Sequence, residues 1–289
     1  MREAGLKATP NRRQLLLGGC AALACSATST SLFAANKSTP TIRLGMASYT
    51  FRKFGPAQVI GFMHQLKCPY LNVKDIHLPM APLGDVPRLA ANYREAGIQL
   101  TNAGAIYFKV DTDEDVRTRF EYLKAAGIKS FVGAPTRALL PRVEKFVREY
   151  DIRMAIHNHG PHDTEWPSPF DIEKVIRNMD HRIGYCIDIG HTLRIKVDPV
   201  AAIRMAGPRL YNLHTKDLAK SDIKGEMACV PVGDGVVPTR EIFKALADIQ
   251  YPYYVDLEHE VNEDNPVPDV LKSFVYMRKL IAEMGYLAG

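Results

Sequence analysis

The chain has 289 residues, of which 46% are hydrophobic and 24% are charged, a composition typical of a globular protein with a sizeable core. Its formal net charge is +5, but residues 1–35 hold four basic residues and one acidic residue. The rest of the chain carries 33 basic and 31 acidic residues. A chain so close to neutrality lacks the electrostatic footprint of a nucleic-acid-binding protein.

The first 35 residues have the pattern of an export signal. Arg12 and Arg13 precede a short apolar stretch, and small residues then lead to a candidate cleavage point at Ala34 and Ala35. Paired arginines are typical of a twin-arginine signal, which carries a folded protein across a bacterial membrane. We therefore expect an exported, periplasmic protein. Two cysteines in the signal leave a lipid anchor open, and no later apolar run is long enough to span a bilayer.

From residue 42 onward, short apolar stretches alternate eight times with amphipathic ones. The helical pattern is clear at 111–126, where Val116, Phe120 and Leu123 recur with a period near 3.6 residues. Gly97 and Gly127 stand where helix C-caps are expected. Further helices are predicted at 141–150, 171–178, 199–205, 239–249 and 270–284, and strands at 42–51, 70–77, 98–107, 128–133, 152–158, 183–189, 210–214 and 253–258.

This eightfold alternation predicts one α/β domain, a single (β/α)₈ TIM barrel, over residues 40–289. A doubly wound open sheet is the structural alternative, but it usually has a glycine-rich nucleotide loop after its first strand, and the sequence has none. In (β/α)₈ barrels the chemistry is located at the C-terminal ends of the strands. The prediction can therefore be tested by asking which side chains gather at those ends.

Metal-competent and titratable side chains do gather at five predicted strand ends. Most of the histidines are among them. The sequences at the ends of the second, fifth, sixth, seventh and eighth strands are Lys74-Asp75-Ile76-His77, His157-Asn158-His159, Asp188-Ile189-Gly190-His191, His214-Thr215-Lys216-Asp217 and Glu258-His259-Glu260.

Four consecutive strands can each direct one donor to a common point. Successive side chains of a strand alternate in direction, so His157 can face the barrel mouth while its neighbour faces the helices. The predicted ligands are His157, Asp188, His214 and Glu258. Each alone has an ordinary structural explanation, and their coincidence on adjacent strands carries the prediction. Two imidazoles and two carboxylates suit Mn²⁺, Co²⁺, Fe²⁺ or Zn²⁺ better than Ca²⁺.

Three of these segments carry a family resemblance: Asp-x-Gly-His at 188–191, His-x-Lys-Asp at 214–217, and Glu258. The chain resembles the xylose isomerase-like superfamily of sugar isomerases and epimerases over its whole mature length. That superfamily includes tagatose/allulose 3-epimerases, inosose dehydratases and 3-dehydroshikimate dehydratases, with endonuclease IV a more distant relative. The resemblance implies one divalent ion, with Mn²⁺ favoured, bound by a Glu, an Asp, a His and a Glu from strands 5 to 8. Asp188, His214 and Glu258 match the last three.

The strand-5 ligand departs from the family pattern, because His157 stands where relatives have a glutamate. Epimerases of the family use the strand-5 and strand-8 glutamates as a pair of bases, one on each face of the substrate carbon. A metal-bound imidazole has no free lone pair and is a poor base. A symmetrical two-glutamate epimerisation is therefore not expected here.

The predicted chemistry is proton transfer next to a carbonyl. An ion that binds a ketose carbonyl and a neighbouring hydroxyl stabilises the enediolate, and a base removes the proton. The candidate bases, in order, are Glu258, His159 and His191. The alternative role of the two histidines is to hold the ligand carboxylates in place. The predicted substrate contacts are Lys74, His77, Lys216 and Glu260. Lys216 is expected either to polarise a substrate oxygen or to pair with Asp217.

The main hypothesis is a metal-dependent isomerase or epimerase that acts on a small, uncharged keto-sugar. The alternative is a lyase that eliminates a β-substituent from a keto-sugar, keto-glycoside or inosose-like ketone. A third hypothesis is a metal-free carbohydrate-binding barrel. A nuclease is the least supported hypothesis, because the multi-zinc site of the superfamily's nuclease branch needs more ligands than these strand ends supply. Outside the signal the cysteines are Cys68, Cys186 and Cys229, an odd set that predicts no disulfide framework. The sequence leaves the substrate, the natural metal and the oligomeric state open.

Overall fold

The computed structural model describes residues 39–219 and 229–289. The predicted export signal lies outside the described residues. The strands are β1 (Thr41–Ala47), β2 (Tyr70–Val73), β3 (Gln99–Ala103), β4 (Ile106–Phe108), β5 (Ser130–Pro135), β6 (Arg153–His157), β7 (Ile183–Asp188), β8 (Leu210–Thr215), β9 (Asp217–Leu218), β10 (Cys229–Val230), β11 (Tyr254–Leu257) and β12 (Leu287–Ala288). The helices are α1 (Pro56–Gln65), α2 (Val86–Glu95), α3 (Asp113–Ala126), α4 (Leu140–Tyr150), α5 (Pro169–Ile176), α6 (Ile189–Arg194), α7 (Pro199–Ala206), α8 (Thr239–Asp248) and α9 (Val267–Glu283).

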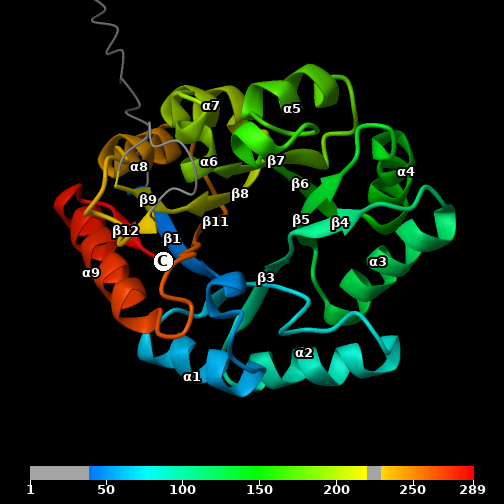
Figure 1. The fold of residues 1–289 in the computed structure, drawn as a ribbon, viewed down its shortest axis with the longest axis horizontal. Coiled ribbons are helices and arrows are strands. Elements are labelled where there is room, and N and C mark those ends of the chain that lie inside the picture. Colours follow the sequence, from blue (N-terminus) through cyan, green and yellow to red (C-terminus); the bar gives the residue numbers. More distant parts are fainter. Residues whose placement is uncertain (1–38, 220–228) are drawn as a thin grey trace, which may run out of the picture. The chain divides into compact units, whose positions relative to one another are not determined.

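Nine strands form a parallel sheet in the order β3-β2-β1-β11-β8-β7-β6-β5-β4. The two edge strands, β3 and β4, are the two halves of the single strand predicted at 98–107. The chain itself therefore joins the two edges, and the sheet curves into a nearly closed barrel with the helices around it (Figure 1). This α/β arrangement is that of a TIM barrel.

Gly104 separates the two halves of this strand. Its φ is +146°, and a Cβ placed there would lie 2.4 Å from the carbonyl oxygen of Val132. Only a residue without a side chain fits such a close approach of two backbones. The break ends the pairing with β2 and lets the chain continue as β4 beside β5.

The helices cover the barrel with the apolar faces that their sequences predict. In α4 the buried residues Leu140, Val143, Phe146 and Val147 recur every three or four positions. Gly127 ends α3 in the left-handed conformation, as its predicted C-cap role requires. In the part of the chain that the structure describes, none of the helices combines the length and apolarity needed to cross a bilayer.

The strand register places the predicted ligand strands side by side. His157 is opposite Cys186 across β6 and β7, Asp188 is opposite His214 across β7 and β8, and Asp256 is opposite His214 across β11 and β8. Because all these strands are parallel, their C-terminal ends meet at one rim of the barrel.

Candidate active site

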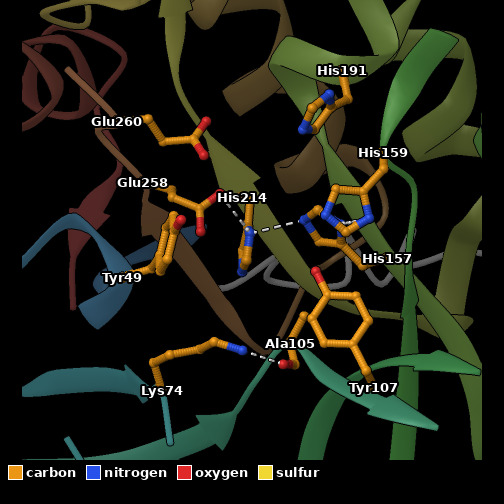
Figure 2. Close-up of a pocket in the computed structure, with 10 residues that line it drawn as sticks. All are labelled: Tyr49, Lys74, Ala105, Tyr107, His157, His159, His191, His214, Glu258 and Glu260. Carbon is orange, nitrogen blue, oxygen red and sulfur yellow. Dashed lines mark hydrogen bonds and ion pairs between the residues drawn. The ribbon is translucent and has the colours of Figure 1, made fainter. Parts of the chain in front are cut away.

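A cavity of about 270 Å³ opens at the C-terminal ends of the strands, near the small end of the range for ligand sites. Figure 2 shows the ten residues that line it, which come from both sides of the barrel. They are Tyr49, Lys74, Ala105, Tyr107, His157, His159, His191, His214, Glu258 and Glu260.

The four predicted ligands converge beside this cavity. One donor atom from each of His157, Asp188, His214 and Glu258 lies within 4.8 Å of the other three, and all four residues are buried. His157 Nε2 is 3.1 Å from His214 Nδ1 and 3.6 Å from Asp188 Oδ2. His214 Nδ1 is in turn 3.3 Å from Glu258 Oε2. The structure thus brings together donors that are up to 101 residues apart in the sequence.

The donor set fits a divalent ion. Asp188 Oδ2 is buried and, among the described residues, has no hydrogen-bond partner, although Lys216 Nζ approaches it to 3.0 Å. A buried carboxylate oxygen without a hydrogen bond is uncommon and needs an explanation. The ring nitrogens of His157 and His214 face each other at 3.1 Å, and a metal ion would accept a lone pair from each of them together with those of the two carboxylates.

Asn72 on β2 supports His214 from its other ring nitrogen. Asn72 Nδ2 lies 2.9 Å from His214 Nε2, whereas Asn72 Oδ1 is buried without a partner among the described residues. The reversed amide places Oδ1 on an Nε2–H donor, and this exchange of O and N leaves the side chain's shape unchanged. His214 Nδ1 then keeps its lone pair toward the other ligands, which is the tautomer that a metal requires.

Lys216 is buried beneath these carboxylates and is 1% exposed. Its Nζ lies 3.0 Å from Asp188 Oδ2, 2.9 Å from Glu258 Oε2 and 2.6 Å from Glu260 Oε2. Burial alone would lower the pKa of Lys216, but these three carboxylates raise it well above its ordinary value. Burial would likewise raise the pKa of Asp188 and of Glu258, yet Lys216 outweighs it and holds both pKa values well below the ordinary range.

Asp217 has a different role from the predicted pairing with Lys216. Its carboxylate accepts backbone N–H bonds from Leu218, Gly233, Gly235 and Val237, at distances of 2.8 to 3.1 Å. These bonds hold the segment that follows β10 against the end of β8. The pairing prediction was wrong because the side chain of Asp217 points opposite to that of its neighbour.

The two histidines predicted as bases both line the cavity. His159 Nδ1 lies 3.3 Å from His157 Nδ1 and 3.5 Å from Asp163 Oδ2. His191 Nδ1 lies 3.1 Å from Arg194 Nη1. Burial is the main reason that the pKa values of His157 and His191 fall to about 3. Both imidazoles are therefore neutral near pH 7, which is the form that binds a metal or accepts a proton.

The predicted substrate contacts divide into two groups. Lys74 and Glu260 line the cavity, and Lys74 Nζ donates to the carbonyl of Ala105 at 2.5 Å. His77 does not line it, because its Nδ1 lies 2.9 Å from Ser48 Oγ and its Nε2 contacts two backbone carbonyls at 3.1 Å. Lys216 also lies away from the cavity surface, behind Glu258 and Glu260.

Two tyrosines complete the cavity and were missed from the sequence. Tyr49 belongs to the short 3₁₀ helix Ser48–Phe51 that follows β1, and Tyr107 lies in β4. Lys74 Nζ is 5.3 Å from the centre of the Tyr107 ring, within cation–π distance. Both tyrosines stand near predicted strand ends, so an aromatic residue at that position is the sequence signal that marks them.

Comparisons with known proteins agree with this fold. Residues 137–280 match the family model described as xylose isomerase-like TIM barrel. Among curated protein sequences, none matches the chain.

Several solved structures share the architecture. The probable 3-DHS dehydratase AsbF of Bacillus anthracis is 13% identical, with 82% of this chain and 99% of that chain covered and a TM-score of 0.67. The IolI protein with a bound zinc atom is 15% identical over 84% of this chain and 97% of its own, with a TM-score of 0.65. The 3-keto-D-glucoside 4-epimerase YcjR of E. coli is 12% identical over 82% and 99%, with a TM-score of 0.66. At these identities the likeness establishes the fold alone.

Proposed function

Because the chain has a xylose isomerase-like TIM barrel domain, we propose that it is a divalent-metal-dependent enzyme that moves a proton next to the carbonyl of a small keto-sugar. The observation that carries the proposal is the convergence of His157, Asp188, His214 and Glu258 beside a cavity of about 270 Å³. Relatives of the same fold include proteins described as an epimerase and as a probable dehydratase, and one that holds zinc. The reaction proposed first is isomerisation or epimerisation.

The four ligands would hold the ion. When bound, it would supply Lewis-acid stabilisation of the negative charge that develops on the substrate oxygens. Lys216 keeps Asp188 and Glu258 ionised in the buried site, so both are ready as ligands at neutral pH. Tyr49 and Tyr107 line the cavity, where their rings would pack against the apolar face of a sugar.

His159 is the base that this geometry favours. Glu258 is less suited, because Lys216 holds its pKa far below its ordinary value and makes it a weak proton acceptor. His159 Nδ1 faces Asp163, and a tautomer that donates this N–H to the carboxylate leaves a lone pair on Nε2. His159 therefore takes the proton of the carbon next to the carbonyl at Nε2. Return of that proton to the neighbouring carbon isomerises the sugar.

The opposite side of the cavity supports the lyase as the second candidate. Lys74 lies at the end of β2, across the barrel from β6, and Figure 2 shows its ammonium on the side of the cavity away from His159. An ammonium in that place can protonate a leaving oxygen, whereas the family's second glutamate base is replaced by His157. Elimination of a β-hydroxyl or β-alkoxy group needs one base and one acid, which is the pair that His159 and Lys74 provide.

The experiment is solvent exchange in D₂O with ketoses and keto-glycosides, on protein loaded in turn with Mn²⁺, Co²⁺, Fe²⁺ and Zn²⁺. Deuterium in a recovered sugar isomer supports the isomerase or epimerase, and an unsaturated product supports the lyase. Asp188→Asn and His159→Gln test the ligand and the base, with Lys244→Met as a surface control. Stoichiometric metal with neither exchange nor elimination across the substrates would refute the proposed enzyme. Absence of stoichiometric metal after loading with each ion would refute it too and favour the metal-free carbohydrate-binding barrel.

We also propose that residues 1–35 are an export signal that directs the enzyme to the periplasm. The mass of the protein recovered from periplasmic extracts tests it. A mature chain that starts near residue 36 supports export, and a full-length chain confined to the cytoplasm contradicts it.

A further inference from the structure

Cys186 lies directly beneath the proposed metal ligands. It precedes Asp188 by two residues on β7, so both side chains project from the same face of the strand into the barrel. Cys186 is fully buried, and the strand register sets it opposite His157. Its sulfur and one nitrogen of each of His157 and His214 lie within 4.8 Å of one another, a group that shares the two imidazoles with the four proposed ligands and includes neither carboxylate.

The surroundings of the sulfur leave it available as a donor. Its one hydrogen bond among the described residues goes to Asn212 Oδ1, at 3.4 Å. A thiol is a weak hydrogen-bond donor, so this contact is a weak one. Asn212 is fixed in turn, because its Nδ2 donates to Asp256 Oδ2 at 2.7 Å. The amide therefore keeps its oxygen toward the sulfur.

We infer that Cys186 is a soft ligand of this metal site and makes it select Zn²⁺ or Co²⁺ over Mn²⁺. The inference rests on the proposed function, because it presumes that the four ligands bind an ion. Thiolates favour Zn²⁺ and neighbouring soft ions, whereas oxygen donors suit Mn²⁺. The balance of the step is simple: the metal–sulfur bond forms, the S–H bond breaks, and the proton leaves to the solvent.

Cys68 is the matched control. It is also buried, but its sulfur contacts the backbone carbonyls of Leu44 and Tyr70, each at 3.5 Å, and among the described residues it has no hydrogen bond to an imidazole. Cys68→Ser therefore removes a buried thiol without altering the metal donors. Cys186→Ser replaces the sulfur by an oxygen of similar size in the donor cluster.

The test is the absorption spectrum of the Co²⁺-loaded protein, followed by competition between Zn²⁺ and Mn²⁺. The wild type and Cys68→Ser should show a near-ultraviolet sulfur-to-cobalt charge-transfer band, which Cys186→Ser should lack while keeping the visible bands of bound Co²⁺. The preference for Zn²⁺ over Mn²⁺ should fall at least about tenfold in Cys186→Ser.

Stoichiometric Co²⁺ in the wild type without the charge-transfer band would overturn the ligand role of Cys186 and leave the proposed function intact. Failure of the wild type to bind Co²⁺ would overturn both. The wild-type spectrum decides the matter even if Cys186→Ser does not fold.

Discussion

Replacement of Lys216 by methionine tests the electrostatics of the site most directly. Methionine has a similar length and no charge, so Lys216→Met removes the ammonium that contacts Asp188, Glu258 and Glu260 at 3.0, 2.9 and 2.6 Å. Two of these carboxylates are buried and ionised. Their charges repel each other once the cation is absent.

The expected loss follows from burial. Removal of one partner from a buried ion pair costs about 3–5 kcal/mol, because the remaining charge is left uncompensated. We expect the metal-free Lys216→Met protein to lose stability in this range at pH 7. The matched control is Lys244→Met, whose lysine is 61% exposed and lies 2.9 Å from Asp248. An exposed pair of this kind contributes at most about 1 kcal/mol.

Urea unfolding with a chelator, at several pH values, measures both variants. Lys216 depresses the pKa values of Asp188 and Glu258, so its stabilisation is present above their unfolded pKa values and disappears as the pH falls through the acid range. The difference in the free energy of unfolding between the wild type and Lys216→Met should therefore shrink toward pH 3. It should also shrink when a divalent ion is added, because the ion supplies positive charge to the same two carboxylates.

Two results would refute this reasoning. One is a metal-free Lys216→Met protein as stable as Lys244→Met at pH 7. The other is a gap that stays constant with pH and with added metal, since an uncompensated charge must respond to both.

Three further substitutions test other parts of the site. Burial raises the pKa of Asp256 from 3.8 to about 6, so as the pH rises the unfolded chain loses this proton at a lower pH than the folded protein does. The stabilisation from this protonated carboxyl is present below pH 4 and is lost as the pH rises through 6. In urea unfolding, the free energy of unfolding of Asp256→Asn should therefore rise relative to the wild type by up to about 3 kcal/mol between pH 4 and pH 7. A difference that stays constant with pH would contradict this. Asn72→Leu should weaken metal binding by about 10- to 100-fold in calorimetry, because it removes the partner of His214 Nε2; unchanged affinity would show that Asn72 does not select the tautomer. Gly104→Ala should lower the free energy of unfolding by more than about 1 kcal/mol in the same assay, since its Cβ would lie 2.4 Å from the Val132 carbonyl oxygen. An unchanged stability would mean that the break between β3 and β4 tolerates a side chain.

Local patterns in the sequence were enough for the architecture and for the four candidate ligands. Strand–helix alternation is a short-range signal, and in a parallel barrel it also places every strand end at one rim. His157, Asp188, His214 and Glu258 could be grouped on that basis, because the first three occupy the last inward-facing positions of β6, β7 and β8 and Glu258 directly follows β11. No contact between particular side chains had to be known.

The contacts between these strand ends were decided only by the tertiary structure. Lys216 was expected either to polarise a substrate oxygen or to pair with Asp217, yet its partners come from β7 and from the end of β11. His77 was expected in the cavity and instead binds the segment after β1 through both ring nitrogens. Tyr107 lines the cavity from β4, the short strand that follows the break at Gly104.

The positions of Asn72 and Cys186 around the ligands likewise depend on how strands distant in sequence align. The period of a strand tells which face a side chain occupies, and this much the sequence by itself determined. Which residue lies opposite it depends on register, barrel closure and the packing of the loops. Those are set by contacts between residues far apart in the chain, so only the folded barrel decides them.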